Sequence, residues 1–372
     1  MKPIIARIAL LTTCVGISAH AAPFMAVGDN AELFVTASAQ VQFDDNIYLD
    51  PTNEADDTIM SFTPGMDLVF GKGSATKGNA YYREEIRRYS DNGNQDTELS
   101  NLGLNANYDS GVTKASFNAS YAQVAQNDND ANALGAIVRR KLFNLGGRLE
   151  FGLSEKTSLA VGANIDQTNY SPTSYTDSNI WNLPVDVYYK ATPRLDWSLG
   201  YRYRSTDLSG SAIDSTDNFI NVGARGEFTP KLTGQVRIGF TQRSFDVGGD
   251  DSQLGFDSNL TYAFSEKTSY RFNLSNDFGA SGTGDSTENF TIGLNASSKL
   301  TEQWALSGGL NLRKIDYPTR SDDFLEGQVA VTYSLNAVVN FGASYTYRNN
   351  SSDLGSAEFK NSVFSFGANI RY

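Results

Sequence analysis

Cysteine and histidine are almost absent from this chain, which has one of each, Cys14 and His20. Both lie in an N-terminal segment in which basic residues precede an apolar stretch, and a small-residue cleavage site ends this segment at Ala21. The layout predicts a secretory signal peptide over 1–21 that is removed from the mature protein. Cys14 also permits a lipoprotein interpretation, which the short apolar segment before it disfavours.

Removal of this segment leaves a mature chain, 22–372, without cysteine or histidine. Disulfides, thiolate and imidazole metal ligands, cysteine nucleophiles and a histidine general base are then excluded. Acidic clusters such as Asp250-Asp251 favour solvated loops over a calcium site, because no segment has the full calcium-loop pattern. We therefore expect no enzyme activity, no cofactor and no metal site.

Long apolar runs and an excess of basic residues are also missing. No mature segment approaches the roughly 18 consecutive apolar residues of a transmembrane helix. Lys and Arg total 30 against 42 Asp and Glu. The net charge is therefore negative, whereas proteins that bind nucleic acid need an excess of basic residues. The chain is instead rich in aromatic residues (12%) and glycine (33 residues), with 9 prolines. This composition is typical of a transmembrane β-barrel, in which only every second strand residue faces lipid.

The end of the chain shows a clear alternation. Apolar or aromatic side chains occupy every even position of 364–372, and small or polar ones occupy the odd positions. Successive strand side chains point to opposite faces, so this segment predicts a two-faced strand that ends on an aromatic residue, Tyr372. A terminal strand of this kind indicates a bacterial outer-membrane barrel.

The same period of two recurs along the chain. Tight turns such as 192–194 and 229–231 alternate strictly with longer polar loops, as short periplasmic turns and longer outer loops do in outer-membrane barrels. We predict an all-β fold, a single antiparallel up-and-down transmembrane barrel of about 18 strands over 22–372. Sixteen strands is the alternative, because Pro64 interrupts one segment and residues 81–85 do not show which face of the predicted strand is turned toward water.

Aromatic residues gather near both ends of the predicted strands. In lipid-embedded barrels such residues form girdles at the two membrane interfaces. A soluble β-sandwich would show similar alternation, but a chain of this length would normally divide into several domains. The predicted girdle consists of Trp197, Tyr201, Tyr203, Phe228, Phe264, Trp304, Tyr333, Tyr345, Tyr347 and Tyr372.

One segment near the start of the mature chain carries a family resemblance. The sequence Phe43-Asp44-Asp45-Asn46-Ile47-Tyr48-Leu49, followed by Phe62-Thr63-Pro64-Gly65-Met66, resembles the opening of the putative β-barrel porin 2 family. The resemblance implies a porin-like barrel over nearly the whole mature chain, with no catalytic residues. Members are often encoded beside exopolysaccharide genes, so it also implies exopolysaccharide or its export proteins as partners.

The side chains between the outward apolar sets should line the lumen. Ten arginines exceed six acids among these candidates, which favours a weakly anion-preferring pore. The competing interpretation is a lattice of ion pairs that stiffens the wall, each exposed pair contributing under about 1 kcal/mol. Inward aromatics, mainly Phe34, Tyr188 and Phe324, are too few for a sugar-binding path. The pore-lining candidates are Arg140, Arg148, Glu150, Asp166, Asp186, Arg202, Arg204, Arg225, Glu227, Arg237, Arg243, Asp257, Arg271, Arg313, Glu326 and Arg348.

Together these patterns predict a porin-like channel in the outer membrane of a Gram-negative bacterium, for passive passage of small hydrophilic solutes or ions. The alternative is a non-conducting accessory or anchoring barrel of an exopolysaccharide export system. Outer-membrane lipid, lipopolysaccharide and the barrel assembly machinery are the expected partners. The lumen should be water-filled or narrowed by loops, although the longest loop, 44–57, is too short to favour an inward-folded constriction.

Overall fold

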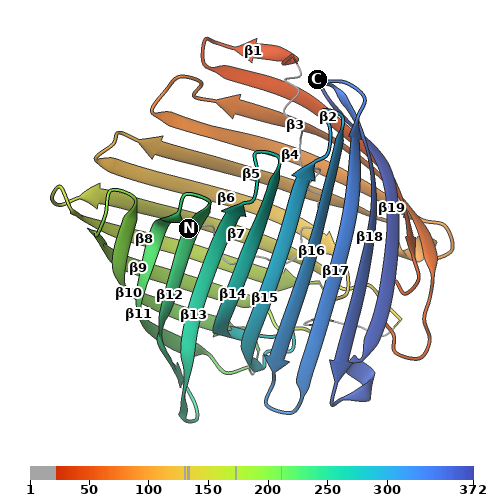
Figure 1. Cartoon of the computed structure of the whole chain (residues 1–372). Coiled ribbons are helices and arrows are strands. Elements are labelled where there is room, and N and C mark those ends of the chain that lie inside the picture. The colour runs from red at the N-terminus through yellow and green to blue at the C-terminus, as the bar shows by residue number, and fades with distance from the viewer. Residues whose placement is uncertain (1–21, 130, 132–134, 172–173, 211) are drawn as a thin grey trace.

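The computed structural model describes residues 22–129, 131, 135–171, 174–210 and 212–372. The predicted signal peptide, with Cys14 and His20, lies outside the described residues. The described chain forms one antiparallel sheet that closes on itself (Figure 1). Its strands are β1 (Met25–Val27), β2 (Ala31–Asp44), β3 (Asp57–Phe70), β4 (Thr76–Tyr89), β5 (Thr97–Asp109), β6 (Thr113–Ala125), β7 (Arg139–Gly152), β8 (Thr157–Tyr170), β9 (Ser178–Lys190), β10 (Leu195–Leu208), β11 (Ser215–Thr229), β12 (Leu232–Phe245), β13 (Asp250–Ala263), β14 (Thr268–Ala280), β15 (Ser286–Lys299), β16 (Trp304–Asp316), β17 (Ser321–Ser334), β18 (Val339–Ser352) and β19 (Phe359–Arg371).

The ring closes between the last long strand and the first. β19 pairs with β2 from Val363↔Asp44 to Arg371↔Thr36, and each of the strands between them pairs with its neighbours in sequence. The short β1 pairs with β2 alone. The barrel therefore has 18 strands, β2 to β19, as predicted, and the 16-strand alternative is wrong.

The outer wall carries the predicted apolar sets. Exposed hydrophobic residues recur at alternate positions of most strands, as Phe364, Phe366 and Ile370 do in β19. A soluble protein would bury such residues, whereas lipid solvates them. The side chains between them face the lumen, and many of these polar residues are buried against one another.

Pro64, which complicated the prediction of β3, lies inside that strand. It pairs with Ala37 of β2, but the pairing with β4 is interrupted between Phe62↔Ile86 and Gly65↔Arg83, with the register unchanged. Proline has no N–H to donate to a neighbouring strand. β3 therefore loses its pairing with β4 at Thr63 and Pro64.

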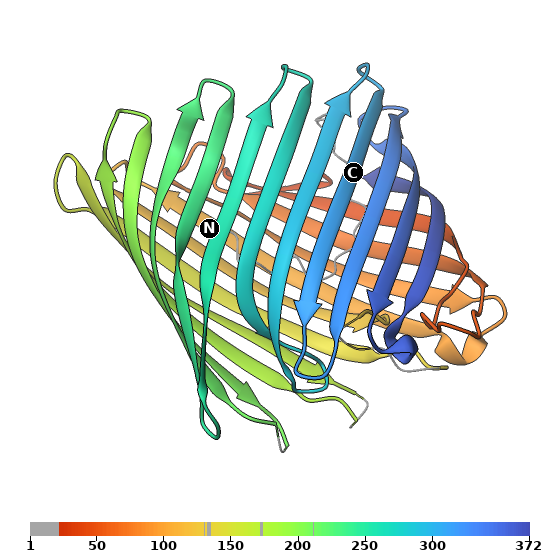
Figure 2. The same cartoon turned by 60° about the horizontal axis from the view of Figure 1, so that its bottom comes forward.

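The two rims of the barrel differ. Tight turns connect the strands at one rim, and the longer loops lie at the opposite rim, along the lower right of Figure 2. Gly71 (φ +83°) illustrates the tight turns, since a Cβ there would lie 1.9 Å from the carbonyl oxygen of Thr76. The helical elements described are two single turns, η1 (Gly93–Gln95) and η2 (Gly355–Ala357), both in long loops. No described helix has the length and apolarity to cross a bilayer.

Candidate permeation pathway

A cluster of arginines surrounds Tyr188 on the inner wall of β7 to β12. Arg148 and Arg237 both donate to a carboxylate oxygen of Asp186, at 2.8 and 3.1 Å, and to the Tyr188 hydroxyl, at 2.9 and 3.2 Å. The guanidinium of Arg225 lies 3.3 Å from the centre of the Tyr188 ring. Cation–π contact and charge pairing together hold this part of the wall rigid.

A second cluster lies nearer the long-loop rim. Asp217 is fully buried and accepts hydrogen bonds from Arg204 and Arg243. Asp277 receives two hydrogen bonds from Arg202, at 2.8 and 2.9 Å, and two from Arg204. Two carboxylates and three guanidiniums thus form one continuous network across β10, β11, β12 and β14.

Ion pairing is general among the ten predicted arginines. Among the described residues, eight of them have a carboxylate within ion-pair distance. The side chain of Arg313 approaches Asn129. Arg271 is exposed on the lumen side of β14, near the tight-turn rim, with no carboxylate partner among the described residues.

The sequence count of inward acids was too low. It omitted Asp196, Asp217 and Asp277, which all pair with predicted arginines. Each of the three lies on the same alternating face as a counted arginine, so the period-two pattern could have found them. With these acids included, the excess of positive charge in the predicted set shrinks from four to one.

The other predicted pore-lining acids lie in separate places. Glu150 pairs with Arg225 at 2.5 Å, and Glu326 pairs with Arg348 at 3.0 Å. Asp257 lies 3.9 Å from Arg237. Asp166 accepts from two asparagines of β7 and β8, and Glu227 pairs with Arg194 at the tight-turn rim.

The predicted girdle residues lie on the outer wall. Trp197, Phe264 and Trp304 are exposed near tight turns, and Tyr345 is exposed toward the long-loop rim. Trp304 packs on Tyr333 with ring centres 4.8 Å apart. Phe278 continues the alternation of the exposed Phe272 and Leu274 but is buried, with the Arg243 guanidinium 4.7 Å from its ring centre.

The loop between β2 and β3, residues 45–56, folds into the barrel mouth. Asn46 is fully buried; its side-chain amide donates to the carbonyl oxygens of Asp50 (2.9 Å) and Lys360 (3.0 Å), and its side-chain oxygen accepts from the Asp50 N–H (2.9 Å). This tight turn holds Leu49 at φ +54°, a region that leucine rarely adopts. Backbone N–H groups of Thr52 and Asn53 lower the pKa of Asp50.

Apolar side chains of this loop anchor it on two sides. One buried cluster holds Ile47 and Tyr48 against residues at the long-loop ends of β3 to β6 and against Ile137, just before β7. A second places Leu49 against Phe324 of β17 and Phe359 of β19. The family-like segment 43–49 therefore forms a structured constriction, with its strain compensated by burial and hydrogen bonds.

The described residues of the loop between β6 and β7, 126–129, 131 and 135–138, pack on the first loop, and Asn129 reaches the loop after β16. The amide of Asn127 donates to the carbonyl oxygen of Tyr48 at 2.9 Å. The carbonyl oxygen of Asn129 accepts from the Tyr317 hydroxyl (3.3 Å) and from Arg320 (3.4 Å), both in the loop after β16. Counted around the closed sheet, β16 lies eight strands from β6, close to the opposite wall.

The length of these loops did not favour an inward-folded constriction, whereas residues 45–56 fold into the mouth. The β2–β3 and β6–β7 loops are joined by the buried Asn127, which donates to the carbonyl oxygen of Tyr48. The physical signal was present in the apolar residues Ile47, Tyr48 and Leu49, which a solvated loop would not carry.

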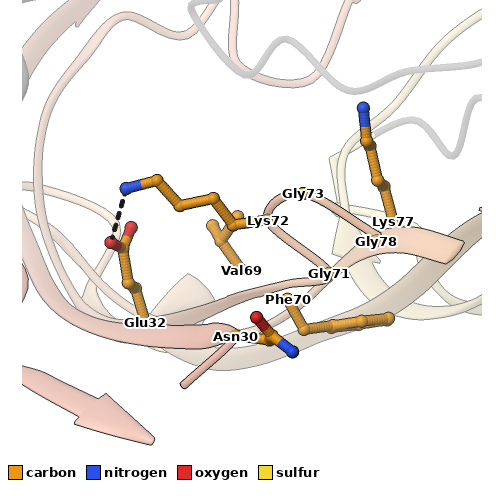
Figure 3. Close-up of a pocket in the computed structure, with 9 residues that line it drawn as sticks. All are labelled: Asn30, Glu32, Val69, Phe70, Gly71, Lys72, Gly73, Lys77 and Gly78. Atoms are coloured by element: carbon orange, nitrogen blue, oxygen red, sulfur yellow. Dashed lines mark hydrogen bonds and ion pairs between the residues drawn. The ribbon is translucent and has the colours of Figure 1, made fainter. Parts of the chain in front are cut away.

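A surface pocket lies at the opposite rim, around the β3–β4 turn (Figure 3). It is lined by glycines and by Lys72, which pairs with Glu32 at 3.3 Å while remaining largely exposed. An open, solvated pair of this kind binds little by itself. Among the described residues, no three potential His, Cys, Asp or Glu ligands gather to hold a metal ion.

Comparison with solved structures finds other bacterial barrels. OpdK of Pseudomonas aeruginosa, crystallised with vanillate, matches with TM-score 0.47 and 8% identity, over 93% of this chain and 100% of that one. OpdL of the same species (TM-score 0.47, 12% identity) and a BenF-like porin from Pseudomonas fluorescens Pf-5 (TM-score 0.48, 12% identity) each match over 92% of this chain and 99% of theirs.

No match was found among curated proteins. A family model described as putative β-barrel porin 2 matches residues 22–372, which is the family that the 43–49 and 62–66 segments resemble. Family and fold both indicate an outer-membrane barrel. The chain belongs to the putative β-barrel porin 2 family.

Proposed function

We propose that this porin is a narrow channel for passive passage of small hydrophilic solutes and ions across the outer membrane. The observation that carries the proposal is the inner wall of β7 to β14, which is largely polar and whose charges are held in place by pairing. Fixed, matched charges keep a lumen hydrated without binding one solute tightly. The two mouth loops, 45–56 and 126–138, set the width.

Charge selectivity should be weak. Arginines that are paired with carboxylates contribute little field along the axis, because opposite charges a few ångströms apart cancel at longer range. Arg271 is the exception on the described wall, being exposed and without a carboxylate partner. The proposed anion preference therefore rests mainly on this side chain.

Selectivity is tested by the reversal potential of single channels in a planar bilayer with a KCl gradient. Arg271→Glu makes the net charge of the lumen more negative by two and should move a weak anion preference toward cations. Lys267→Glu, an equal change in the tight turn before β14, is the control and should shift it less. A reversal potential unaffected by Arg271→Glu contradicts the assignment of the lumen-facing charge.

The joined mouth loops favour one further candidate, a barrel that does not conduct and serves as an accessory or anchor for exopolysaccharide export. Such a barrel would need the mouth to stay closed. Absence of stepwise conductance in both the intact protein and a loop-loosened variant would support this alternative over the channel.

A further inference from the structure

The inner wall around Arg271 differs from the arginine clusters of β7 to β12. Arg271 lies on β14 opposite Asn295 of β15, and its side chain is exposed to the lumen without an ion pair to a described residue. By contrast, the guanidiniums of Arg148 and Arg237 are held by Asp186. A guanidinium held in this way has few N–H groups left for a solute, whereas Arg271 keeps all of its donors.

The lumen-facing side chains next to Arg271 carry no charge. The nearest acid on the lumen face of β13 is Asp257, which is paired in the ladder with Ser275 and lies toward the mouth. Glu266 belongs to the exposed tight turn, where Lys267 follows it. An anion at the guanidinium therefore meets no carboxylate on the neighbouring strands. The paired and diagonal neighbours on the lumen face are Asn259, Thr261, Ser269, Asn273, Gly293, Asn295 and Ser297.

Three asparagines beside this guanidinium have side chains that are free to bind a solute. Asn259 and Asn295 are exposed, and neither they nor Asn273 form a side-chain hydrogen bond within the described part of the chain. A Cβ at Gly293 would lie 3.4 Å from Nδ2 of Asn273. A Cβ at Gly309 would lie 3.0 Å from Oδ1 of Asn295. The two glycines thus let these amides lie against the wall, which leaves the lumen beside the guanidinium open.

A guanidinium surrounded by neutral amides is complementary to one class of solute. The guanidinium presents parallel N–H groups that match the oxygens of a carboxylate or a phosphate. A side-chain amide both donates and accepts, so it can bind hydroxyl groups in either direction. An anion without hydroxyl groups would use only the first of these contacts, and a neutral polyol only the second.

We propose that Arg271, with Asn259, Asn273 and Asn295, forms a binding site in the lumen for a small hydroxylated solute that carries one carboxylate or phosphate group. The oxyanion accepts from the Arg271 guanidinium, and the hydroxyl groups of the solute bind the three amides. Binding in a channel must be weak enough for the solute to leave again. The inference rests on the proposed function, because the solute reaches Arg271 through the lumen.

The test measures binding without any current. Saturation-transfer NMR on the barrel, residues 22–372, in phosphatidylcholine nanodiscs gives the dissociation constant, with empty nanodiscs as the reference. The probes are D-gluconate and D-glucose 6-phosphate, and the one that binds more tightly identifies the natural oxyanion. Hexanoate, which lacks the hydroxyl groups, and sorbitol, which lacks the charge, should each bind about tenfold more weakly than D-gluconate.

Variants assign the binding to the proposed residues. Arg271→Gln should weaken D-gluconate binding about tenfold, the effect of losing a hydrogen bond to a charged group. Asn295→Ala should weaken it roughly threefold, the effect of losing a neutral one. Lys267→Gln removes the same charge from the turn before β14, and Asn340→Ala removes a lumen-facing amide of β18 near the same rim. Neither control should change the dissociation constant.

Two results would overturn the proposal: D-gluconate binding that is unchanged in Arg271→Gln, or hexanoate or sorbitol bound as tightly as D-gluconate. The outcome also separates the site from the channel. A barrel that binds D-gluconate but stays silent in a planar bilayer contradicts the channel alone. A barrel that conducts but binds neither probe contradicts the site alone.

Discussion

The hydroxyl of Tyr317 donates a hydrogen bond of 3.3 Å to the carbonyl oxygen of Asn129, and this contact joins two loops that leave nearly opposite walls of the barrel. Arg320 donates to the same oxygen at 3.4 Å. The width of the mouth is therefore determined by side chains that connect loops, in addition to the number of strands. Strand number alone would give a wide lumen.

Asn127→Ala should widen the mouth without weakening the barrel. The Asn127 side chain makes three described hydrogen bonds, to Tyr48 (2.9 Å), Ala136 (2.8 Å) and Val138 (2.8 Å), each contributing about 0.5–1.5 kcal/mol. Single-channel current should rise and become noisier, while the urea midpoint of the barrel stays unchanged. Asn336→Ala, in a tight turn at the other rim, is the control and should leave the current as it is.

Asn46→Ala and Asn127→Ala should not act independently. Asn46 sets the turn that holds Leu49, and Asn127 binds the carbonyl oxygen of Tyr48 in that same loop. Residues in one network show coupling of about 0.5–3 kcal/mol. Limited proteolysis of the loop in both single variants and the double variant measures this coupling as opening free energies, and simple additivity would show that the loops open separately.

Asp217→Asn should destabilise the barrel strongly. It removes the charge that accepts hydrogen bonds from Arg204 and Arg243, and breaking a buried pair in this way costs about 3–5 kcal/mol. Urea unfolding followed by tryptophan fluorescence measures the loss. Arg271→Gln, which breaks no ion pair among the described residues, should change stability by no more than about 0.5 kcal/mol; equal effects of the two variants would refute the stiffening role of the lattice.

Deletion of Tyr372 should reduce barrel assembly. Its N–H and carbonyl group pair with Val35 at 2.9 and 2.7 Å, and its ring meets the edge of Phe24 with centres 6.4 Å apart. The residue thus extends the β19–β2 pairing that closes the ring. The heat-modifiable, folded fraction in outer-membrane preparations should fall on deletion and recover with Tyr372→Phe, which keeps the backbone and the ring.

The strand pattern was predictable because every second strand residue faces lipid and is apolar, as Phe364 and Phe366 are. The pairing of the lumen charges was only partly predictable: alternation places Arg202 and Asp277 on the inner face, but they lie 75 residues apart, and the curvature of the barrel brings them together. The folding of Ile47 and Leu49 into the mouth depends on Asn127 and Phe324, contacts that no local pattern specifies.

Single-channel recording of the barrel, residues 22–372, in a planar bilayer tests the central claim, a polar channel whose width is limited by the mouth loops. We expect small stepwise currents for the intact protein and larger steps for the Asn46→Ala, Asn127→Ala double variant. A bilayer that stays silent with both proteins, although both are folded barrels, would contradict it.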